Sequence, residues 1–249
     1  MTEHFRSFDG TEIAFSQMGD GPPLLLLHGL FSSAETNWIR YGTARRLADL
    51  GHRLILADFR GHGKSACPDA PEAWPADVLA QDMEALIAHL DLGTDFVACG
   101  YSLGARTVVR LLARGMRPKA AILCGMGLQG IVSGAARGEW FIRMIEGRGS
   151  WQRGSGEFVA EAFMRANVGN PDAIIHLLRG QLGTSVETLA TLLLPICVIC
   201  GADDQDNGSA HALAAALPDA RHVEIPGTHM SSVTRPELAA AIGAFAAAH

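Results

Sequence analysis

The sequence has few aromatic residues, no basic cluster and no long apolar run. Aromatic residues make up 6% of the 249 residues, and the net charge is −6. Because no Lys or Arg cluster stands out, nucleic acid and anionic membranes are not expected partners. The longest apolar stretches, Pro22–Leu27 and Leu238–Ala248, are too short to cross a bilayer. The N-terminus, Met1 to Arg6, lacks the apolar core of a signal peptide.

Cysteine is also scarce, and five is an odd number in a chain too large to need disulfide staples. We therefore expect reduced thiols and a cytoplasmic protein. Cys197 and Cys200 have C-x-x-C spacing but fall inside an apolar run that predicts a strand. Residues three apart on a strand point to opposite faces, so these thiols are not expected to pair or to share a metal.

What the sequence does contain is an alternation of short apolar runs with amphipathic stretches. This pattern predicts an α/β fold with a mostly parallel, eight-stranded sheet and helices on both faces. An N-terminal hairpin is expected from residues 4–8 and 12–18, joined through Asp9-Gly10. The other expected strands are residues 24–28, 53–58, 96–99, 120–124, 196–200 and 222–225. The expected helices are residues 79–90, 103–114 and 210–217, and a last one that begins at Pro236.

The stretch from Gly125 to Thr191 breaks this rhythm, because it holds glycines, scattered aromatics and helical fragments without a convincing strand. We interpret it as an insertion between two strands, over residues 125–191, rather than as a separate domain. Residues 1–124 and 192–249 then form the core. Gly125 to Gly130 spells G-x-G-x-x-G after a strand, but no compact β-α-β unit follows, so dinucleotide binding is not expected. No cofactor is expected.

The segment Gly100-Tyr101-Ser102-Leu103-Gly104 carries the strongest chemical signal. It matches G-x-S-x-G between an apolar strand and a helix. A sharp turn there projects the serine hydroxyl above the sheet, and the flanking glycines let neighbouring backbone pass. The start of the helix places N–H groups and a positive dipole end beside the serine. Ser102 is therefore the predicted nucleophile.

A serine hydroxyl needs a base, and the base needs an acid that orients it. The chain order expected after a G-x-S-x-G serine is an acid after a late strand, then a histidine. Asp203, Asp204 and Asp206 follow the strand at 196–200, and His229 follows the strand at 222–225. His229 is the predicted base; the order alone leaves the three aspartates open.

Further segments make the chain similar to the α/β-hydrolase superfamily along nearly its whole length. Leu24 to Gly29 resembles the strand and His-Gly turn before the oxyanion loop, and Asp58 to Ser65 resembles the segment D-x-R-G-x-G-x-S. Gly201-x-x-Asp204 and Gly227-Thr228-His229 resemble the acid and base loops. The resemblance implies the α/β-hydrolase fold, with residues 125–191 as a small, mostly helical cap, Asp204 as the acid, and His28 and His62 in structural turns. It also implies an oxyanion hole from the backbone N–H groups of Leu103 and Leu30, with Phe31 as the second choice.

The expected function is that of a serine hydrolase that cleaves a carboxylic ester, or a related acyl bond, of a small to medium substrate without a metal. Thioester, carbon–carbon bond, lactone and perhydrolysis chemistry stay open, as does a hydrolase-fold binding or signalling protein with little turnover. Serine rather than aspartate at residue 102 argues against the dehalogenase and epoxide-hydrolase branches.

Arg and acidic residues are about balanced across the cap, so charge does not argue for an anionic substrate. The expected partner is a small acyl substrate, and the oligomeric state is open. The substrate pocket is expected to draw on Phe31, Tyr101, Met126, Trp140 and Met144, with the alternative that such residues form the cap's own core.

Overall fold

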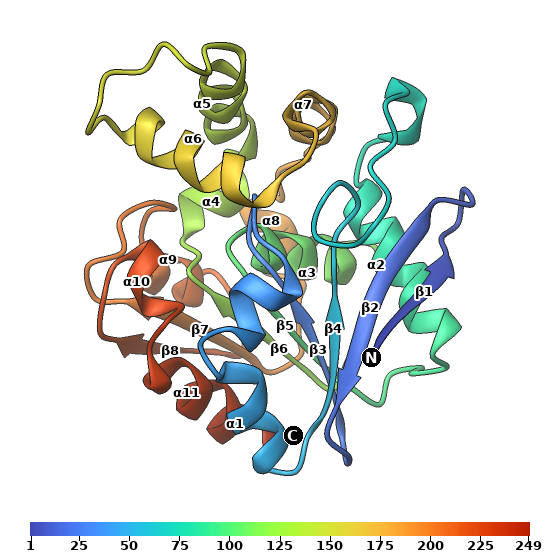
Figure 1. Ribbon diagram of the computed structural model, residues 1–249. Helices are drawn as coiled ribbons and strands as arrows, with labels where there is room; N and C mark the ends of the chain where they lie inside the picture. Colours follow the sequence, from blue (N-terminus) through green and yellow to red (C-terminus); the bar gives the residue numbers. More distant parts are fainter.

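A twisted eight-stranded sheet lies at the centre of the computed structural model, which describes residues 1–249 except for the side chains of residues 134–136 (Figure 1). The spatial order of the strands is β1-β2-β4-β3-β5-β6-β7-β8. The first two strands pair antiparallel with each other and β2 pairs antiparallel with β4, while all other neighbours are parallel. The strands are β1 (Thr2–Arg6), β2 (Glu12–Met18), β3 (Pro23–Leu27), β4 (Arg53–Ala57), β5 (Val97–Tyr101), β6 (Ala120–Cys124), β7 (Ile196–Gly201) and β8 (Ala220–Ile225).

Helices cover both faces of the sheet, as the alternating pattern predicts. On one face, α1 (Thr43–Asp49) and α11 (Pro236–Ala246) contact each other; α2 (Val78–His89) and α3 (Leu103–Ala113) do the same on the other (Figure 1). Strand residues that point to opposite faces enter two separate core clusters: Cys200 lies in one and Cys197 in the other. The two thiols are therefore turned apart, as their spacing predicts.

Five helices lie in the chain between β6 and β7, the segment predicted to form a cap. They are α4 (Leu128–Val132), α5 (Gly134–Glu146), α6 (Gly156–Asn167), α7 (Pro171–Arg179) and α8 (Val186–Leu189). Figure 1 shows α5, α6 and α7 together at one end of the sheet, away from the end where the N- and C-termini lie. We keep the name cap for residues 125–191, whose boundaries as a unit stay a prediction.

Several short elements escape the sequence pattern. Three of them have three to five residues: a π-helix at Glu35–Ile39, a 3₁₀-helix at Pro71–Ala73 and α10 (His229–Ser232). The helix α1 has seven. The first strand, β1, begins two residues earlier than predicted. Its bounds follow from its pairing with β2, in which Phe5 lies opposite Ile13, and not from an alternation of apolar residues. α9 (Ala210–Ala215) and α11 lie within the predicted helical stretches.

Candidate active site

The turn between β5 and α3 holds Ser102 in an unusual backbone conformation. Its φ is 53° and its ψ is −109°, a combination that costs a non-glycine residue energy and that packing must enforce. Gly100 and Gly104 make this packing possible. A Cβ atom on Gly100 would lie 2.1 Å from the Gly104 carbonyl carbon, and one on Gly104 would lie 2.1 Å from the Leu27 oxygen. Both glycines thus permit a close backbone approach, as the motif predicts.

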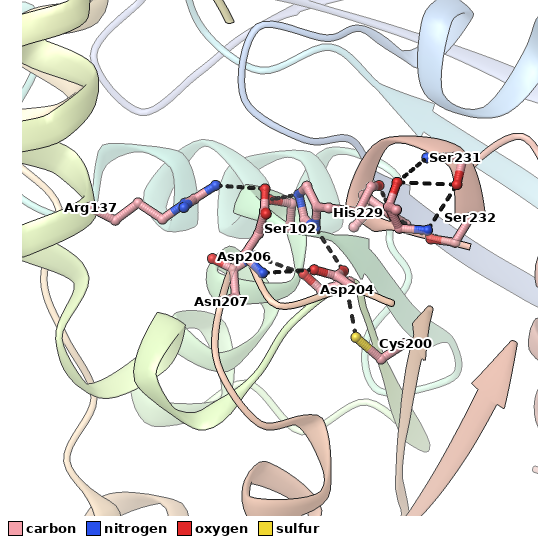
Figure 2. A network of polar contacts seen from close by, with 12 residues as sticks. Ser102, Arg137, Cys200, Asp204, Asp206, Asn207, His229, Ser231 and Ser232 are labelled. Carbon is pink, nitrogen blue, oxygen red and sulfur yellow. Dashed lines mark hydrogen bonds and ion pairs between the residues drawn. The ribbon is translucent and has the colours of Figure 1, made fainter. Parts of the chain in front are cut away.

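Ser102, His229 and Asp204 come together in the structure although they lie far apart in the sequence (Figure 2). His229 Nε2 is 3.1 Å from Ser102 Oγ, and His229 Nδ1 is 2.8 Å from Asp204 Oδ2. Asp204 is buried, and its carboxylate also accepts the Asp206 N–H at 3.1 Å and faces the Cys200 thiol at 3.6 Å. Burial opposes ionisation of Asp204, but the hydrogen bond and charge of His229 outweigh it and lower the pKa.

The three competing aspartates are separated by their contacts. Asp206 Oδ2 pairs with Arg137 of α5 at 2.9 Å and so faces away from His229, while Asp203 is exposed. Among the described side chains, the carboxylate that reaches His229 belongs to Asp204. Figure 2 shows this division, with Arg137 and Asp206 on one side and His229 on the other.

His229 is supported by Tyr101, the residue next to Ser102. It is the first residue of α10, which Thr228 caps by accepting the Ser231 N–H. Tyr101 Oη donates to the His229 carbonyl at 2.6 Å and lies 2.9 Å from Ser232 Oγ. Burial raises the pKa of Tyr101, so the phenol stays protonated and can donate. Tyr101, predicted as a substrate contact, lines a large cavity beside Ser102 and also supports the helix that carries His229.

The His-Gly turn after β3 offers a free backbone donor near Ser102. The N–H groups of Leu30 and Leu103 have no hydrogen-bond partner among the described residues. Gly29 N–H donates to Asn37 Oδ1 at 3.0 Å, and Phe31 N–H donates to His62 Nε2 at 3.2 Å. Phe31 is the second choice for the oxyanion hole, but its N–H already has a hydrogen-bond acceptor in His62.

Two buried histidines hold the turn, a role that the resemblance implies but that residue spacing does not reveal. His28 Nε2 accepts the Phe59 N–H at 3.0 Å, while His62 Nε2 accepts from Phe31. Burial lowers the pKa of His28 to about 4, and burial together with His28 lowers the pKa of His62 to about 3. Both rings are therefore neutral at pH 7, which leaves each Nε2 free to accept.

A large cavity of about 410 Å³ opens beside Ser102 and His229. Its walls are mostly apolar and come from the His-Gly turn, the π-helix after it, the turn at Ser102, the cap and the segment around α10. Of the residues predicted to bind substrate, Phe31, Tyr101 and Trp140 line this cavity, and Met126 lines a smaller one next to it. Met144 lines neither; it is fully buried in the core, where its carbonyl accepts from Trp151 Nε1 at 2.9 Å. The spacing of aromatics and methionines could not tell these two environments apart.

The G-x-G-x-x-G segment serves close packing in this structure. A Cβ atom on Gly127 would lie 2.1 Å from the Gly208 oxygen, and one on Gly130 would lie 2.8 Å from Asn207 Cβ. These glycines let the loop that follows Asp204 pack against the first turn of the cap. No helix in the described part of the chain is long and apolar enough to span a membrane.

Comparisons with known proteins agree with this architecture. A non-heme haloperoxidase from Rhodococcus erythropolis is 38% identical over 106 residues, which are 43% of this chain and 36% of the relative's length. An esterase from Exiguobacterium antarcticum superposes with a TM-score of 0.80 at 18% identity and 99% coverage of both chains. An esterase from Thermogutta terrifontis, solved with malate bound, gives 0.75 at 24% identity, over 98% of this chain and 97% of the other. The family model described as "Alpha/beta hydrolase family" matches residues 24–242, so the chain belongs to the α/β-hydrolase family.

Proposed function

We propose that the chain is a serine hydrolase that cleaves a carboxylic ester, or a related acyl bond, of a small to medium substrate through an acyl-enzyme on Ser102. The observation that carries this proposal is the line of contacts from Ser102 Oγ through His229 to Asp204, at 3.1 Å and 2.8 Å. These distances are those of a nucleophile within reach of its base and of a base oriented by an acid.

The proposed reaction follows from these contacts. His229 Nε2 takes the proton of Ser102 as Oγ attacks the acyl carbonyl carbon, and Asp204 stabilises the imidazolium that forms. The unpartnered N–H groups of Leu30 and Leu103 receive the negative charge of the tetrahedral oxygen. His229 then gives its proton to the leaving alkoxide. Water, deprotonated by the same base, attacks the acyl-enzyme; the C–Oγ bond breaks, His229 returns that proton to Ser102 Oγ, and the acid is released.

The relative placement of the donors supports this sequence of steps. Leu103 is the first residue of α3, so its N–H is one of the orphan donors at a helix start, where the dipole favours negative charge. Leu30 belongs to the turn whose neighbouring N–H groups are fixed by Asn37 and His62. A donor that is rigidly held and otherwise unpaired can stabilise developing charge without reorganising.

Perhydrolysis is a second candidate, favoured by the identity with the Rhodococcus haloperoxidase. In that reaction hydrogen peroxide replaces water, attacks the acyl-enzyme and leaves as the peracid, while Ser102 recovers its proton. Peracid formation from acetate and hydrogen peroxide, trapped by bromide oxidation, distinguishes it from hydrolysis.

We also propose a reducing, cytoplasmic compartment, in keeping with five cysteines that are all free thiols in the structure.

A fluorophosphonate probe tests the first proposal. We expect stoichiometric labelling of the wild type, none of Ser102→Ala, and steady turnover of p-nitrophenyl acetate and butyrate. Labelling without turnover would instead favour a binding or signalling protein built on this fold. Labelling of Ser102→Ala to the wild-type extent would refute the assignment of the nucleophile.

A further inference from the structure

An arginine without a counter-ion lies one helical turn beyond Ser102. Arg106 belongs to α3, and its backbone N–H donates to the Ser102 carbonyl at 3.1 Å. The residue is 7% exposed, and its Nη1 is fully buried without a hydrogen-bond partner. Among the described residues, no hydrogen bond or ion pair of the Arg106 side chain is found.

The other buried arginine, Arg60, and the half-buried Arg110 are both paired. Arg60 is bound by Asp82 at 2.7 Å and Asp9 at 2.6 Å, and Arg110, one turn beyond Arg106, is bound by Asp77 at 2.6 Å. Burial of a charge is costly unless a partner compensates it, so a well-packed chain normally supplies one. Arg106 is the exception, and an exception of this kind calls for an explanation.

A small cavity next to Arg106 is suited to an anionic group. It measures about 30 Å³, enough for two water-sized groups such as the two oxygens of a carboxylate. Among its described lining residues there is no carboxylate: the polar side chains are Ser102, Arg106, Arg137, Gln181 and Asn207. The cavity therefore presents cations, amides and a hydroxyl, with one cation unpaired.

The small cavity and the large one meet at the nucleophile. Both are lined by Leu30, Ser102 and Phe141. A substrate whose reacting carbonyl lies at Ser102 can thus extend one arm toward Arg106 and the other into the mostly apolar space beneath the cap. One arm would lie in the narrow cavity lined by cationic side chains, and the other in the wide, mostly apolar cavity.

The charge on Arg106 is not cancelled by its surroundings. Arg137 also lines both cavities, but Asp206 already pairs with it at 2.9 Å. Burial first, and then the charge of Arg137, lower the pKa of Arg106 to about 10, so the guanidinium remains protonated at neutral pH. The even balance of charges in the cap sequence is uninformative here, because the unpaired cation belongs to α3.

We propose that Arg106 binds a carboxylate that the substrate carries on a short chain beside the bond attacked by Ser102. The proposal rests on the proposed function and names its substrate class, an ester of a short-chain acid or alcohol with a free carboxylate. A carboxylate accepts two parallel hydrogen bonds from a guanidinium and supplies the missing counter-charge. Binding at Arg106 also fixes the distance between the anchor and the scissile carbonyl.

Matched pairs of esters test this assignment. Benzyl hydrogen glutarate and benzyl pentanoate share acyl length and leaving group and differ in the terminal carboxylate; a second pair carries the carboxylate on the alcohol side. We expect wild-type kcat/KM to favour the carboxylate in at least one pair by tenfold or more. In Arg106→Met this ratio should fall at least tenfold, mainly through KM, and Arg106→Lys should retain part of it.

The matched control is Arg114→Met, which removes the same charge from the far end of α3, where Arg114 pairs with Glu84 at the surface. It should leave the ratio unchanged. A wild type with no preference in either pair, or a ratio that survives Arg106→Met, overturns the carboxylate site while ester hydrolysis stands.

Direct binding separates this proposal from the hydrolase assignment. Calorimetric titration of Ser102→Ala with benzyl hydrogen glutarate, or with the matched alcohol-side carboxylate, needs no turnover. Combining Ser102→Ala with Arg106→Met should weaken binding of the preferred ester at least tenfold, and equal affinities contradict the site. If no ester is turned over by the wild type, the proposed function fails, and this titration still decides whether Arg106 binds a carboxylate.

Discussion

Three aspartates within four positions of the chain differ in what surrounds them. Asp204 is buried against His229 and Cys200, Asp206 pairs with Arg137 of the cap, and Asp203 is exposed. A carboxylate orients an imidazole only when it is buried within hydrogen-bond distance of Nδ1 and stays ionised. The lowered pKa of Asp204 meets the last condition throughout the neutral range.

Replacing Asp204 with asparagine should therefore cost activity far more than replacing its neighbours. The amide removes the negative charge that stabilises the imidazolium and can impose the wrong tautomer on His229, so we expect kcat to fall by about 10³–10⁴-fold. Initial rates with p-nitrophenyl butyrate measure the effect. Asp203→Asn is the control and should stay within about twofold; a comparable loss there would contradict the assignment of the acid.

The buried histidines His28 and His62 should make the protein sensitive to mild acid. Their folded-state pKa values, about 4 and about 3, lie below the ordinary value of 6.5, so the unfolded chain binds more protons between these limits. Their contribution to stability is complete above about pH 6.5 and is lost as the pH falls toward 4 and 3. The free energy of unfolding, measured in urea between pH 7.5 and 5, should decrease accordingly.

A substitution separates this effect from general acid denaturation. His62→Gln keeps an acceptor near the Phe31 N–H but does not titrate, so the slope of unfolding free energy against pH should become shallower. His4, exposed on β1, provides the control, and His4→Gln should keep the wild-type slope. If both variants followed the wild-type curve, the buried rings would not be the source of the acid sensitivity.

At the scale of elements, the contact between α3 and the end of β3 sets the geometry of the nucleophile turn. Gly104→Ala would drive a Cβ atom to 2.1 Å from the Leu27 oxygen, so helix and strand must separate. We expect a loss of about 3 kcal/mol in the free energy of unfolding, together with loss of activity, because the His-Gly turn follows directly after Leu27. Gly169→Ala, where the added atom meets nothing within 4 Å, should change stability by less than about 0.5 kcal/mol.

Arg60 ties the segment after β4 to α2 and to the first hairpin. Its guanidinium, fully buried, contacts Asp82 of α2 at 2.7 Å and Asp9 at 2.6 Å. Asp82→Asn leaves part of this charge uncompensated, and we expect it to cost about 3–5 kcal/mol in urea unfolding. The exposed pair Arg45 and Asp49 is the comparison: Asp49→Asn should cost no more than about 0.5 kcal/mol. Similar costs for the two variants would argue against a structural role for the buried pair.

Sequence patterns predict some of these elements better than others, for physical reasons. Fully buried parallel strands such as β3 and β6 consist of continuous apolar residues, which identify them without knowledge of their neighbours. The π-helix at Glu35–Ile39 and α10 are too short to show a period. Contacts distant in sequence support them: Gly29 N–H donates to Asn37 of the π-helix, and Tyr101 donates to the His229 carbonyl of α10. The G-x-S-x-G and G-x-x-D spacings locate Ser102 and Asp204, whereas Arg106 resembles any helical arginine until its missing counter-ion is seen.

At the scale of the whole molecule, the loops at one edge of the sheet carry Ser102, Asp204 and His229, and the cap provides part of the cavity wall facing them. Ser102 follows β5, Asp204 follows β7 and His229 follows β8, so the parallel strands bring all three to one edge of the sheet. The contacts that join the cap to this edge include Arg137 with Asp206, and Thr36 Oγ1 donating to Asn167 Oδ1 at 3.2 Å. Cap substitutions should therefore change which substrate is accepted more than the chemistry itself.

Val159 of α6 offers a way to test this division. It lines the large cavity, is 57% exposed and has no part in the contacts around Ser102. Val159→Trp adds bulk to the apolar arm of the cavity, so kcat/KM for naphthylmethyl butanoate should fall at least tenfold, while that for methyl butanoate should stay within about twofold. Val186→Trp on α8, exposed and outside the described cavities, should leave both unchanged. Equal losses for the two esters in Val159→Trp would mean that the cap governs the reacting geometry as well as the choice of substrate.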